Sequence, residues 1–263
     1  MSFKSISVIG AGVMGEALIA ALIKAGHAPE HIEIIEKRDE RCQELNLKYG
    51  IKSGGDLTKS DVVLLVVKPQ DLDALLTSLK GKVNDQALII SFVAGKKIKT
   101  IADLLGGKNP VVRVMPNTPA LVGAGAAGYS FSENVDQHQE RFVKDLLSAA
   151  GKAVQVSEDL QDAVTATSGS GPAYFYAFVE SMIEGAKQLG LSDEVATELT
   201  VQTLIGAAKL LETSGKSAKT LRENVTSPNG TTFAALQSFS ESDLNSIVAK
   251  AMKTARDRSI ELS

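Results

Sequence analysis

The stretch that decides the fold is Ile6-Ser7-Val8-Ile9-Gly10-Ala11-Gly12-Val13-Met14-Gly15, close to the amino terminus. A short apolar run leads directly into glycines spaced G-x-G-x-x-G, and a helical stretch from Glu16 to Ala25 follows. In dinucleotide-binding folds the first glycine permits a tight turn, the second lets the backbone approach a pyrophosphate, and the third lets the helix pack on the strand. The helix N-terminus then presents unpaired N–H groups and a partial positive charge to phosphates. Three glycines at this spacing can also form a plain loop, but their position directly after a strand favours a nucleotide site.

Apolar runs alternate with helical segments through the first 158 residues. We predict strands at Ile32–Ile35, Val62–Val67, Ala87–Ile90 and Val111–Val114, with a helix over Asp39–Tyr49. The third strand of the chain is apolar without alternation, which is typical of a strand covered on both faces. Strands that alternate with helices indicate a parallel sheet built from right-handed βαβ units. Residues 1–158 are therefore predicted to form a Rossmann-type, doubly wound dinucleotide-binding domain.

The pattern changes after residue 158, and from 159 to 263 we predict helices only. Apolar side chains recur there at helical spacing, as in Phe175, Phe178, Met182 and, further on, Ile247 and Met252. Such stripes normally form a core, but their apolar area is large for about a hundred residues. A homodimer that shares these helices would bury the excess. The overall class is α/β, with an all-α dimerisation domain over residues 159–263.

Composition excludes several functions. The 263 residues carry 28 Lys and Arg against 31 Asp and Glu, a net charge of −3, so no basic field is available for nucleic acid. No apolar run approaches the roughly 18 residues of a membrane span, and no signal peptide is visible. The one cysteine, Cys42, cannot form an internal disulfide, which fits the cytoplasm. The three histidines, His27, His31 and His138, are not spaced like metal ligands, so we expect them at the surface and expect no metal site.

The residues that follow each strand are the first candidates for ligand contact, because this fold binds ligands at the carboxyl ends of its strands. Glu36 follows the second strand, about 20 residues beyond Gly15, where an acidic side chain usually takes the ribose hydroxyls of NAD. Its neighbours Lys37 and Arg38 could instead neutralise the 2′-phosphate of NADP. A solvated helix start is the alternative for these two, and the choice of cofactor stays open from these residues.

Special residues also follow the other strands. Lys68-Pro69-Gln70 comes after the third, and Pro69 stops that strand. Phe92-Val93-Ala94-Gly95 comes after the fourth, with small residues that allow close backbone approach. Met115-Pro116-Asn117-Thr118-Pro119 comes after the fifth. A structural lysine or a rigid turn needs no ligand, but special residues at every strand end favour a ligand site at this edge.

Two loops of the helical half contain groups suited to chemistry. Ser168-Gly169-Ser170-Gly171-Pro172 opens a long helix, for which simple capping is the alternative explanation. The loop from Asn224 to Thr232 contains the turn residues Pro228-Asn229-Gly230 and places two hydroxyl groups at a helix start. Exposed N–H groups and hydroxyls at this point could hold a carboxylate. Thr232 could also donate a hydrogen bond to a bound substrate.

This set of motifs resembles the pyrroline-5-carboxylate reductase family over essentially the whole chain. The matching pieces are Ile9–Gly15, Val66–Gln70, Val93–Gly95, Met115–Pro119, Ser168–Tyr174, and Ser227–Pro228 with Gly230–Thr232. The resemblance implies a homodimer, commonly assembled further into a decamer, with a site between the cofactor face of one subunit and the helical loops of its partner. Two positions depart from the family pattern. Asn229 replaces the usual first glycine of an S-P-G-G loop, and Glu36 replaces a small or amide residue.

The resemblance also implies roles for individual residues. Thr232 would be the catalytic residue, with its hydroxyl near the ring nitrogen of 1-pyrroline-5-carboxylate. The substrate carboxylate would be held by Ser227, Gly230, Thr231 and Thr232. The cofactor would be NADP(H) by preference, with NAD(H) possible. The residues implied in cofactor binding are Ile9, Gly10, Ala11, Gly12, Val13, Met14, Lys37, Arg38, Val66, Val67, Lys68, Pro69, Val93, Ala94, Gly95, Asn117 and Asn224.

Two other functions stay open at this point. A 3-hydroxyacid dehydrogenase would share the two-domain plan, but such enzymes generally need a lysine acid/base in the helical domain. A dinucleotide-sensing module would bind the cofactor without turnover, since a fold does not fix a function. The Ser227–Thr232 loop argues against a sensor, because a sensor needs no second small-molecule pocket.

Overall fold

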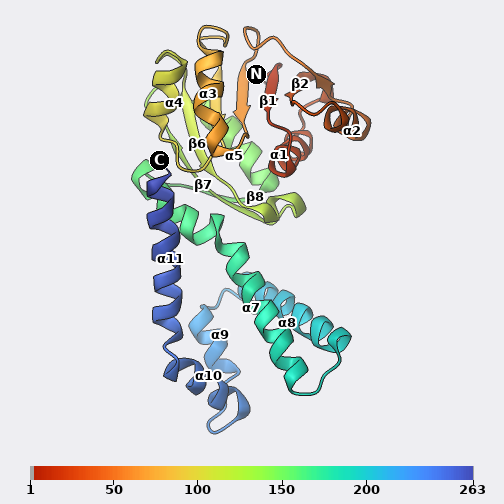
Figure 1. Ribbon diagram of the computed structural model, residues 1–263, viewed down its shortest axis with the longest axis vertical. Helices are drawn as coiled ribbons and strands as arrows, with labels where there is room; N and C mark the ends of the chain where they lie inside the picture. Colours follow the sequence, from red (N-terminus) through yellow and green to blue (C-terminus); the bar gives the residue numbers. More distant parts are fainter. Residues whose placement is uncertain (1–2, 263) are drawn as a thin grey trace. The chain divides into compact units, whose positions relative to one another are not determined.

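The computed structural model describes residues 3–262, and it contains an eight-stranded sheet and a set of helices (Figure 1). The chain divides into two compact units. The first runs up to Ser170 and also takes in the chain from Thr254 onward, and the second is Gly171–Lys253. No helix within residues 3–262 combines the length and the apolar character needed to cross a membrane.

The sheet lies entirely in the first unit. Its strands are β1 (Ile6–Ile9), β2 (Ile32–Ile35), β3 (Lys52–Ser53), β4 (Val62–Leu65), β5 (Leu88–Ser91), β6 (Val111–Met115), β7 (Gly125–Phe131) and β8 (Gly151–Gln155). Their order is β3-β2-β1-β4-β5-β6-β7-β8. The first six strands are parallel, β7 runs antiparallel to β6, and β8 is parallel to β7. The five predicted strands are confirmed, while β3, β7 and β8 were not predicted.

Helices connect the strands and then continue alone. Those of the first unit are α1 (Val13–Lys24), α2 (Asp39–Tyr49), α3 (Pro69–Leu79), α4 (Ile98–Leu105), α5 (Gln137–Ala150) and α6 (Gln161–Val164). A π-helical segment, η4 (Thr165–Gly169), follows α6, and three short 3-10 turns are η1 (Pro29–His31), η2 (Thr118–Val122) and η3 (Glu158–Leu160). The remaining helices are α7 (Gly171–Gln188), α8 (Asp193–Thr213), α9 (Ala218–Asn224), α10 (Thr231–Glu241) and α11 (Leu244–Glu261).

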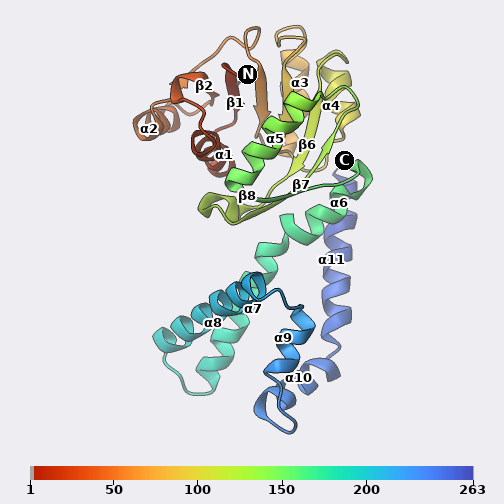
Figure 2. The ribbon, with the colours of Figure 1, turned by 180° about the vertical axis from the view of Figure 1, so that it is seen from behind.

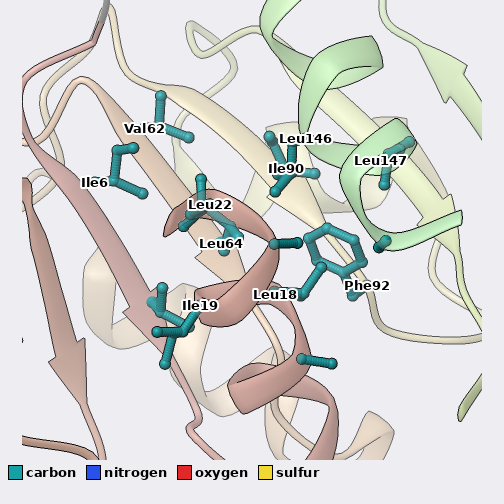
Figure 3. Close-up of a cluster of buried hydrophobic side chains, with 14 of the residues drawn as sticks. Ile6, Leu18, Ile19, Leu22, Val62, Leu64, Ile90, Phe92, Leu146 and Leu147 are labelled. Carbon is teal, nitrogen blue, oxygen red and sulfur yellow. The ribbon is translucent and has the colours of Figure 1, made fainter. Parts of the chain in front are cut away.

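Helices cover both faces of the sheet. Figure 1 shows α3 and α4 on one face, and Figure 2, the view from behind, shows α1 and α5 on the other. Alternate residues of β4 enter the two cores: Val62 and Leu64 pack with α1 and α5, whereas Val63 and Leu65 pack with α3 and α4. Figure 3 shows the first of these cores, where Leu18 and Leu22 of α1 meet the sheet. The continuous apolar run in β4 is thus explained, because each fully buried Leu or Val stabilises the fold by about 1.5–3 kcal/mol.

Strands β7 and β8 were not predicted because neither has the apolar pattern typical of a strand. β7 contains Gly125, Ala126, Ala127 and Gly128, which have little strand propensity. A Cβ atom on Gly128 would lie 2.6 Å from a methyl carbon of Val164 in α6, so a larger residue does not fit. β8 is one of the two outer strands of the sheet and is largely exposed, so it lacks an apolar pattern.

The helical unit has almost no core of its own. Within the described residues 171–253, one apolar side chain is buried, that of Ala196. Phe175 is 61% exposed and Ile205 is 55% exposed. The rings of Phe178 and Phe239 lie 6.3 Å apart, so α7 and α10 touch through aromatic side chains that remain partly exposed. The stripes predicted from the sequence are therefore present on the helices, but a single chain leaves them uncovered.

Candidate functional site

The glycine loop joins β1 to α1 at the centre of the sheet. Gly10 has a φ of +92°, which favours glycine, and its N–H donates to the carbonyl of Ile35 at 2.9 Å. A Cβ atom on Gly10 would lie 2.7 Å from the carbonyl oxygen of Val66. Two of the predicted cofactor segments, at Gly10 and at Val66, are therefore neighbours. They meet where β2 and β4 lie on opposite sides of β1, which is the switch point at which such sheets bind ligands.

The next part of the loop is open. A Cβ atom on Gly12 would have no neighbour within 4 Å, whereas Gly15 packs tightly against the carbonyl of Gly10. Within residues 3–262, the N–H groups of Gly12, Val13 and Met14 donate no hydrogen bond. Free N–H groups at a helix N-terminus, beside open space, suit an anionic ligand. The arrangement fits a pyrophosphate, and Val13, 61% exposed, stands beside that space.

Glu36 follows β2 and is fixed by the residues around it. Its Oε2 accepts from the N–H of Ala11 at 3.0 Å, and its Oε1 accepts from the N–H groups of Lys37 at 3.0 Å and Arg38 at 3.1 Å. The Nε of Arg38 donates to the same Oε1 at 3.0 Å. The hydrogen bond from the Arg38 side chain, against the opposing effect of burial, lowers the pKa of Glu36 to about 2. The carboxylate is thus ionised at neutral pH, while Lys37 and Arg38 stay exposed.

The ends of β4 and β5 present the next predicted segments along the same edge. Val66 and Val67 are half-buried, Lys68 is exposed, and Pro69 is the first residue of α3. Val93 is buried and Ala94 half-buried. Because β1, β4 and β5 are adjacent and parallel, these segments and Ile9 lie side by side.

Gly95 is held by the end of the chain. Its φ is +81°, and a Cβ atom there would lie 2.9 Å from the carbonyl oxygen of Leu262. The backbone of the loop after β5 therefore contacts the chain just beyond α11.

Asn117, at the end of β6, uses its amide within the protein. Its Oδ1 accepts from the N–H of Ala126 at 2.8 Å, and its Nδ2 donates to the carbonyl of Ser168 at 3.0 Å. Asn117 and Met14 line the same small crevice. The amide joins β7 to the π-helical segment η4, and π-helical segments frequently occur at functional sites. Contact between Asn117 and a cofactor stays a prediction.

The second group of predicted residues lies in the helical unit. The N–H of Gly230 donates to the carbonyl of Ser227 at 3.1 Å and closes a turn in which Asn229 has a φ of +59°. Asparagine tolerates this left-handed conformation, which accounts for its place in the loop. A Cβ atom on Gly230 would lie 3.2 Å from the carbonyl oxygen of Ser227, so glycine fits best there.

This turn leads into α10. Gly230 is its N-cap residue and no side chain caps the helix, so Thr231 and Thr232 begin a helix with free N–H groups. Thr231 is exposed and Thr232 half-buried. Asn224 is the last residue of α9 and is exposed. Two hydroxyl groups beside a free helix N-terminus can bind a carboxylate.

The structure also shows what sequence analysis did not find. Of the three histidines expected at the surface, His138 is exposed and His27 and His31 are half-buried, and all three line one cavity of about 350 Å³ together with Arg141 and Asp145. This cavity is at the amino ends of β1 and β2, opposite the glycine loop. Burial lowers the pKa of His27. No group of side chains in residues 3–262 is arranged to hold a metal ion. Arg41, which contacts the glycine loop, was also missed, since only its place one turn after Arg38 hints at a role.

Comparison with known proteins places the chain in a family. Residues 158–262 match the family described as pyrroline-5-carboxylate reductase dimerisation, and residues 5–95 match one described as NADP oxidoreductase, coenzyme F420-dependent. A pyrroline-5-carboxylate reductase of Corynebacterium melassecola is 40% identical and covers 98% of each chain. Pyrroline-5-carboxylate reductase 1 of Bacillus spizizenii is 36% identical over 99% of this chain and 90% of its own.

Solved structures give the same result. The pyrroline-5-carboxylate reductase of Coxiella burnetii superposes with a TM-score of 0.92 at 35% identity, covering 100% of this chain and 99% of the other. That of Plasmodium falciparum, solved with NADP bound, has a TM-score of 0.86 at 28% identity and 99% coverage of both chains. The glycine loop, the turn before α10 and these full-length similarities together show that the chain belongs to the pyrroline-5-carboxylate reductase family.

Proposed function

We propose that this protein reduces 1-pyrroline-5-carboxylate to L-proline with a nicotinamide dinucleotide as the reductant. The observation that carries the proposal is the full-length similarity to reductases of this name, at 36–40% identity. The glycine loop with its free N–H groups and the Ser227–Thr232 turn supply, in addition, one site suited to a pyrophosphate and one suited to a carboxylate.

The reaction needs little covalent chemistry from the protein. When bound, a reduced nicotinamide would supply a hydride to the imine carbon of the substrate, C2 of the pyrroline ring, and would itself be oxidised. The electron pair of the C=N bond passes to the ring nitrogen, which carries a proton, so the product is a secondary amine. The side chains of the protein have to bind the substrate and the cofactor and orient them toward each other. Correct placement of two reactants can account for about 7–11 kcal/mol of the barrier in favourable cases.

We assign the substrate to the start of α10. Ser227, Gly230, Thr231 and the free N–H groups there hold the carboxylate, which is favoured by the positive end of the helix. The hydroxyl of Thr232 donates a hydrogen bond that orients the ring nitrogen and assists its protonation. Thr232 is in this proposal the catalytic residue.

The dinucleotide is assigned to the edge of the sheet. The N–H groups of Gly12, Val13 and Met14 bind the pyrophosphate, with Ile9, Gly10 and Ala11 shaping the turn. The segments Val66–Pro69 and Val93–Gly95 line the remainder of the cofactor. The other residues proposed to bind it are Lys37, Arg38, Asn117 and Asn224.

We propose that NADP(H) is preferred and that NAD(H) is also used. Glu36 has three backbone N–H donors, so Arg38 can turn toward a 2′-phosphate without leaving that carboxylate unpaired. The Arg38 side chain is 61% exposed, so Glu36 is the main contact that it would give up in turning. A relative 28% identical was solved with NADP bound. The Glu36 carboxylate repels a 2′-phosphate at the same time, which reduces the advantage of NADPH and allows NADH to be used.

We further propose that the protein is a homodimer, or a larger assembly of dimers such as a decamer, and that it works in the cytoplasm. Residues 158–262 match a dimerisation family, and the uncovered apolar side chains of α7 and α8 suit a second copy. The single free cysteine, Cys42, is compatible with a reducing compartment.

One assay tests the function. Oxidation of NADPH and of NADH is followed with purified protein, with 1-pyrroline-5-carboxylate present and absent. We expect substrate-dependent oxidation of both, faster with NADPH at low cofactor concentration, and proline as the product. Oxidation of a 3-hydroxy acid with no activity on the pyrroline would point to a hydroxyacid dehydrogenase. Dinucleotide binding without turnover of either compound would point to a sensor.

A further inference from the structure

Both backbone polar groups of Ala11, in the glycine loop, are held by side chains that follow β2. The N–H of Ala11 donates to Oε2 of Glu36 at 3.0 Å, and the carbonyl of Ala11 accepts from Nε of Arg41 at 2.9 Å. Arg41 lies in the first turns of α2, about 30 residues from Ala11 along the chain. Ala11 itself is fully buried.

Arg41 is itself held in place by carboxylates. One terminal nitrogen pairs with Glu16, the residue directly after Gly15, and the other pairs with Glu44 at 2.7 Å. The side chains of Arg41 and Glu16 are 14% and 16% exposed. Each of the three guanidinium nitrogens thus has an acceptor, in the fork geometry that arginine provides and lysine does not.

The contact of Arg41 with the Ala11 carbonyl matters because of the N–H group at the other side of the Ala11–Gly12 peptide group. The carbonyl of Ala11 and the N–H of Gly12 belong to one planar, trans peptide unit, so they point in opposite directions. With its carbonyl held by Arg41, the unit turns the Gly12 N–H away from α2. Gly12 has open space around its α carbon, and glycine readily adopts other backbone angles. Without Arg41 the peptide group could rotate and remove this donor from the pyrophosphate site.

We propose that Arg41 is a positioning residue of the dinucleotide site. It touches no cofactor atom, and it acts by fixing the Ala11–Gly12 peptide so that the Gly12 N–H is preset for a pyrophosphate. The proposal rests on the proposed use of a nicotinamide dinucleotide. Because NADPH and NADH share the pyrophosphate, loss of Arg41 raises the dissociation constants of both cofactors by the same factor.

The test compares three variants of the full-length protein. Arg41→Met keeps an unbranched, shorter apolar side chain and removes all three contacts. Arg41→Lys keeps a charge for Glu16 but lacks Nε. Lys48→Met is the matched control, since Lys48 also pairs with Glu16 from α2, at 2.7 Å, and does not reach Ala11. The dissociation constants for NADPH and NADH are measured by titration, together with Tm and with kcat and KM for 1-pyrroline-5-carboxylate at saturating cofactor.

We expect Arg41→Met to raise both dissociation constants about tenfold. This is about the effect of losing one hydrogen bond to a charged group, here the bond from the Gly12 N–H to the pyrophosphate. Arg41→Lys raises both by a smaller, equal factor, and Lys48→Met leaves both unchanged. At saturating cofactor, kcat and the KM of the pyrroline stay close to wild type. Unchanged dissociation constants with a lowered Tm would overturn the proposal in favour of a purely structural role.

A rise in the NADPH constant alone would also overturn the proposal, because it would mean direct contact of Arg41 with the 2′-phosphate. Should Arg41→Met not fold, Arg41→Lys decides by the same comparison of the two cofactors. A wild-type protein that binds neither dinucleotide would instead refute the proposed function, so the two failures are distinguishable.

Discussion

At the scale of single residues, the hydroxyl of Thr232 is the group assigned to the reacting atoms. Replacing Thr232 by Ala removes a donor to the ring nitrogen, and we expect kcat to fall about a hundredfold, the lower end of what a positioned proton donor contributes. Thr232→Ser keeps the hydroxyl and should retain most of the activity. Steady-state kinetics at saturating NADPH give kcat, and a titration should show unchanged cofactor affinity. A wild-type kcat in Thr232→Ala would remove this residue from the mechanism.

We expect two neighbouring residues, Arg38 and Glu36, to act in opposite directions on the preference between NADPH and NADH. Arg38→Met removes the side chain that can pair with a 2′-phosphate, so KM for NADPH should rise about tenfold, with little change for NADH. Glu36→Gln removes a negative charge from the same place and should lower KM for NADPH relative to NADH. The ratio of kcat/KM for the two cofactors is the measurement. Parallel changes for both cofactors in either variant would contradict this assignment.

At the scale of elements, α2 is fastened to the start of α1 through a single carboxylate. Glu16 accepts from Lys48 at 2.7 Å, from the hydroxyl of Tyr49 at 3.0 Å and from Arg41. The hydrogen bond from Lys48 is the largest cause that lowers its pKa, which falls from 4.5 to about 2 against the effect of burial. A carboxylate with a depressed pKa in the folded state stabilises the fold above its unfolded pKa and loses that contribution as protons bind.

This arrangement predicts a specific dependence of stability on acid. The contribution of Glu16 is complete above pH 4.5 and is lost as the pH falls toward about 2. Glu16→Gln should therefore be less stable than wild type at pH 7. Between pH 4.5 and about pH 2 its free energy of unfolding should change less than that of the wild type. Urea unfolding followed by circular dichroism at several pH values gives the pH dependence of the free energy of unfolding for both proteins. An equal pH dependence in the two proteins would mean that the partners of Glu16 do not stabilise its ionised form.

Another set of elements meets around a buried arginine. Arg113 of β6 is 3% exposed and lies 3.6 Å from Glu158 and 3.4 Å from Asp162. Glu158 also accepts from the N–H of Ile98, at the start of α4, at 2.6 Å, and Asp162 accepts from the hydroxyl of Ser259 in α11 at 2.7 Å. One cation thus joins the sheet to α4, α6 and the end of α11. A buried charge needs such partners because its desolvation costs several kcal/mol.

At the scale of the whole molecule, the helical unit is incomplete in one chain. Within the described residues 171–253 one apolar side chain is buried, which is too little to offset the conformational entropy of a unit of this size, so we expect a second copy to supply the core. The exposed apolar side chains of α7 and α8, among them Phe175, Leu199 and Ile205, are the surface that we expect to be covered.

Ile205→Glu tests this expectation, because a carboxylate in an apolar interface lacks a partner. We expect the variant to have a lower molar mass than wild type in size-exclusion chromatography with light scattering, and a lower Tm. Leu47→Glu is the control: Leu47 is 86% exposed on α2, so the same kind of change there should leave the molar mass unaltered. The Tm of the wild type should also rise with protein concentration. A monomeric wild type would refute the dimer.

The sequence by itself determined the features that depend on local order. The five parallel strands, the turn at Gly10 and the helical character after residue 158 follow from apolar periodicity and glycine spacing, which act over a few residues. The departure at Asn229 was also interpretable, since a φ of +59° is a property of one residue. For the same reason the candidate ligand segments could be located at the ends of the strands.

Only the tertiary structure decided the features that join distant parts of the chain. Gly128 in β7 has to be a glycine because Val164 packs against it, and no local pattern shows this. The contacts of Arg41 with Ala11 and of Arg113 with Asp162 link residues that the sequence separates by several elements. Periodicity indicates which face of an element is apolar, but the partner of a charged side chain depends on which elements pack together. That choice is made by the burial of apolar surface over the whole fold, and it therefore becomes visible only in the folded molecule.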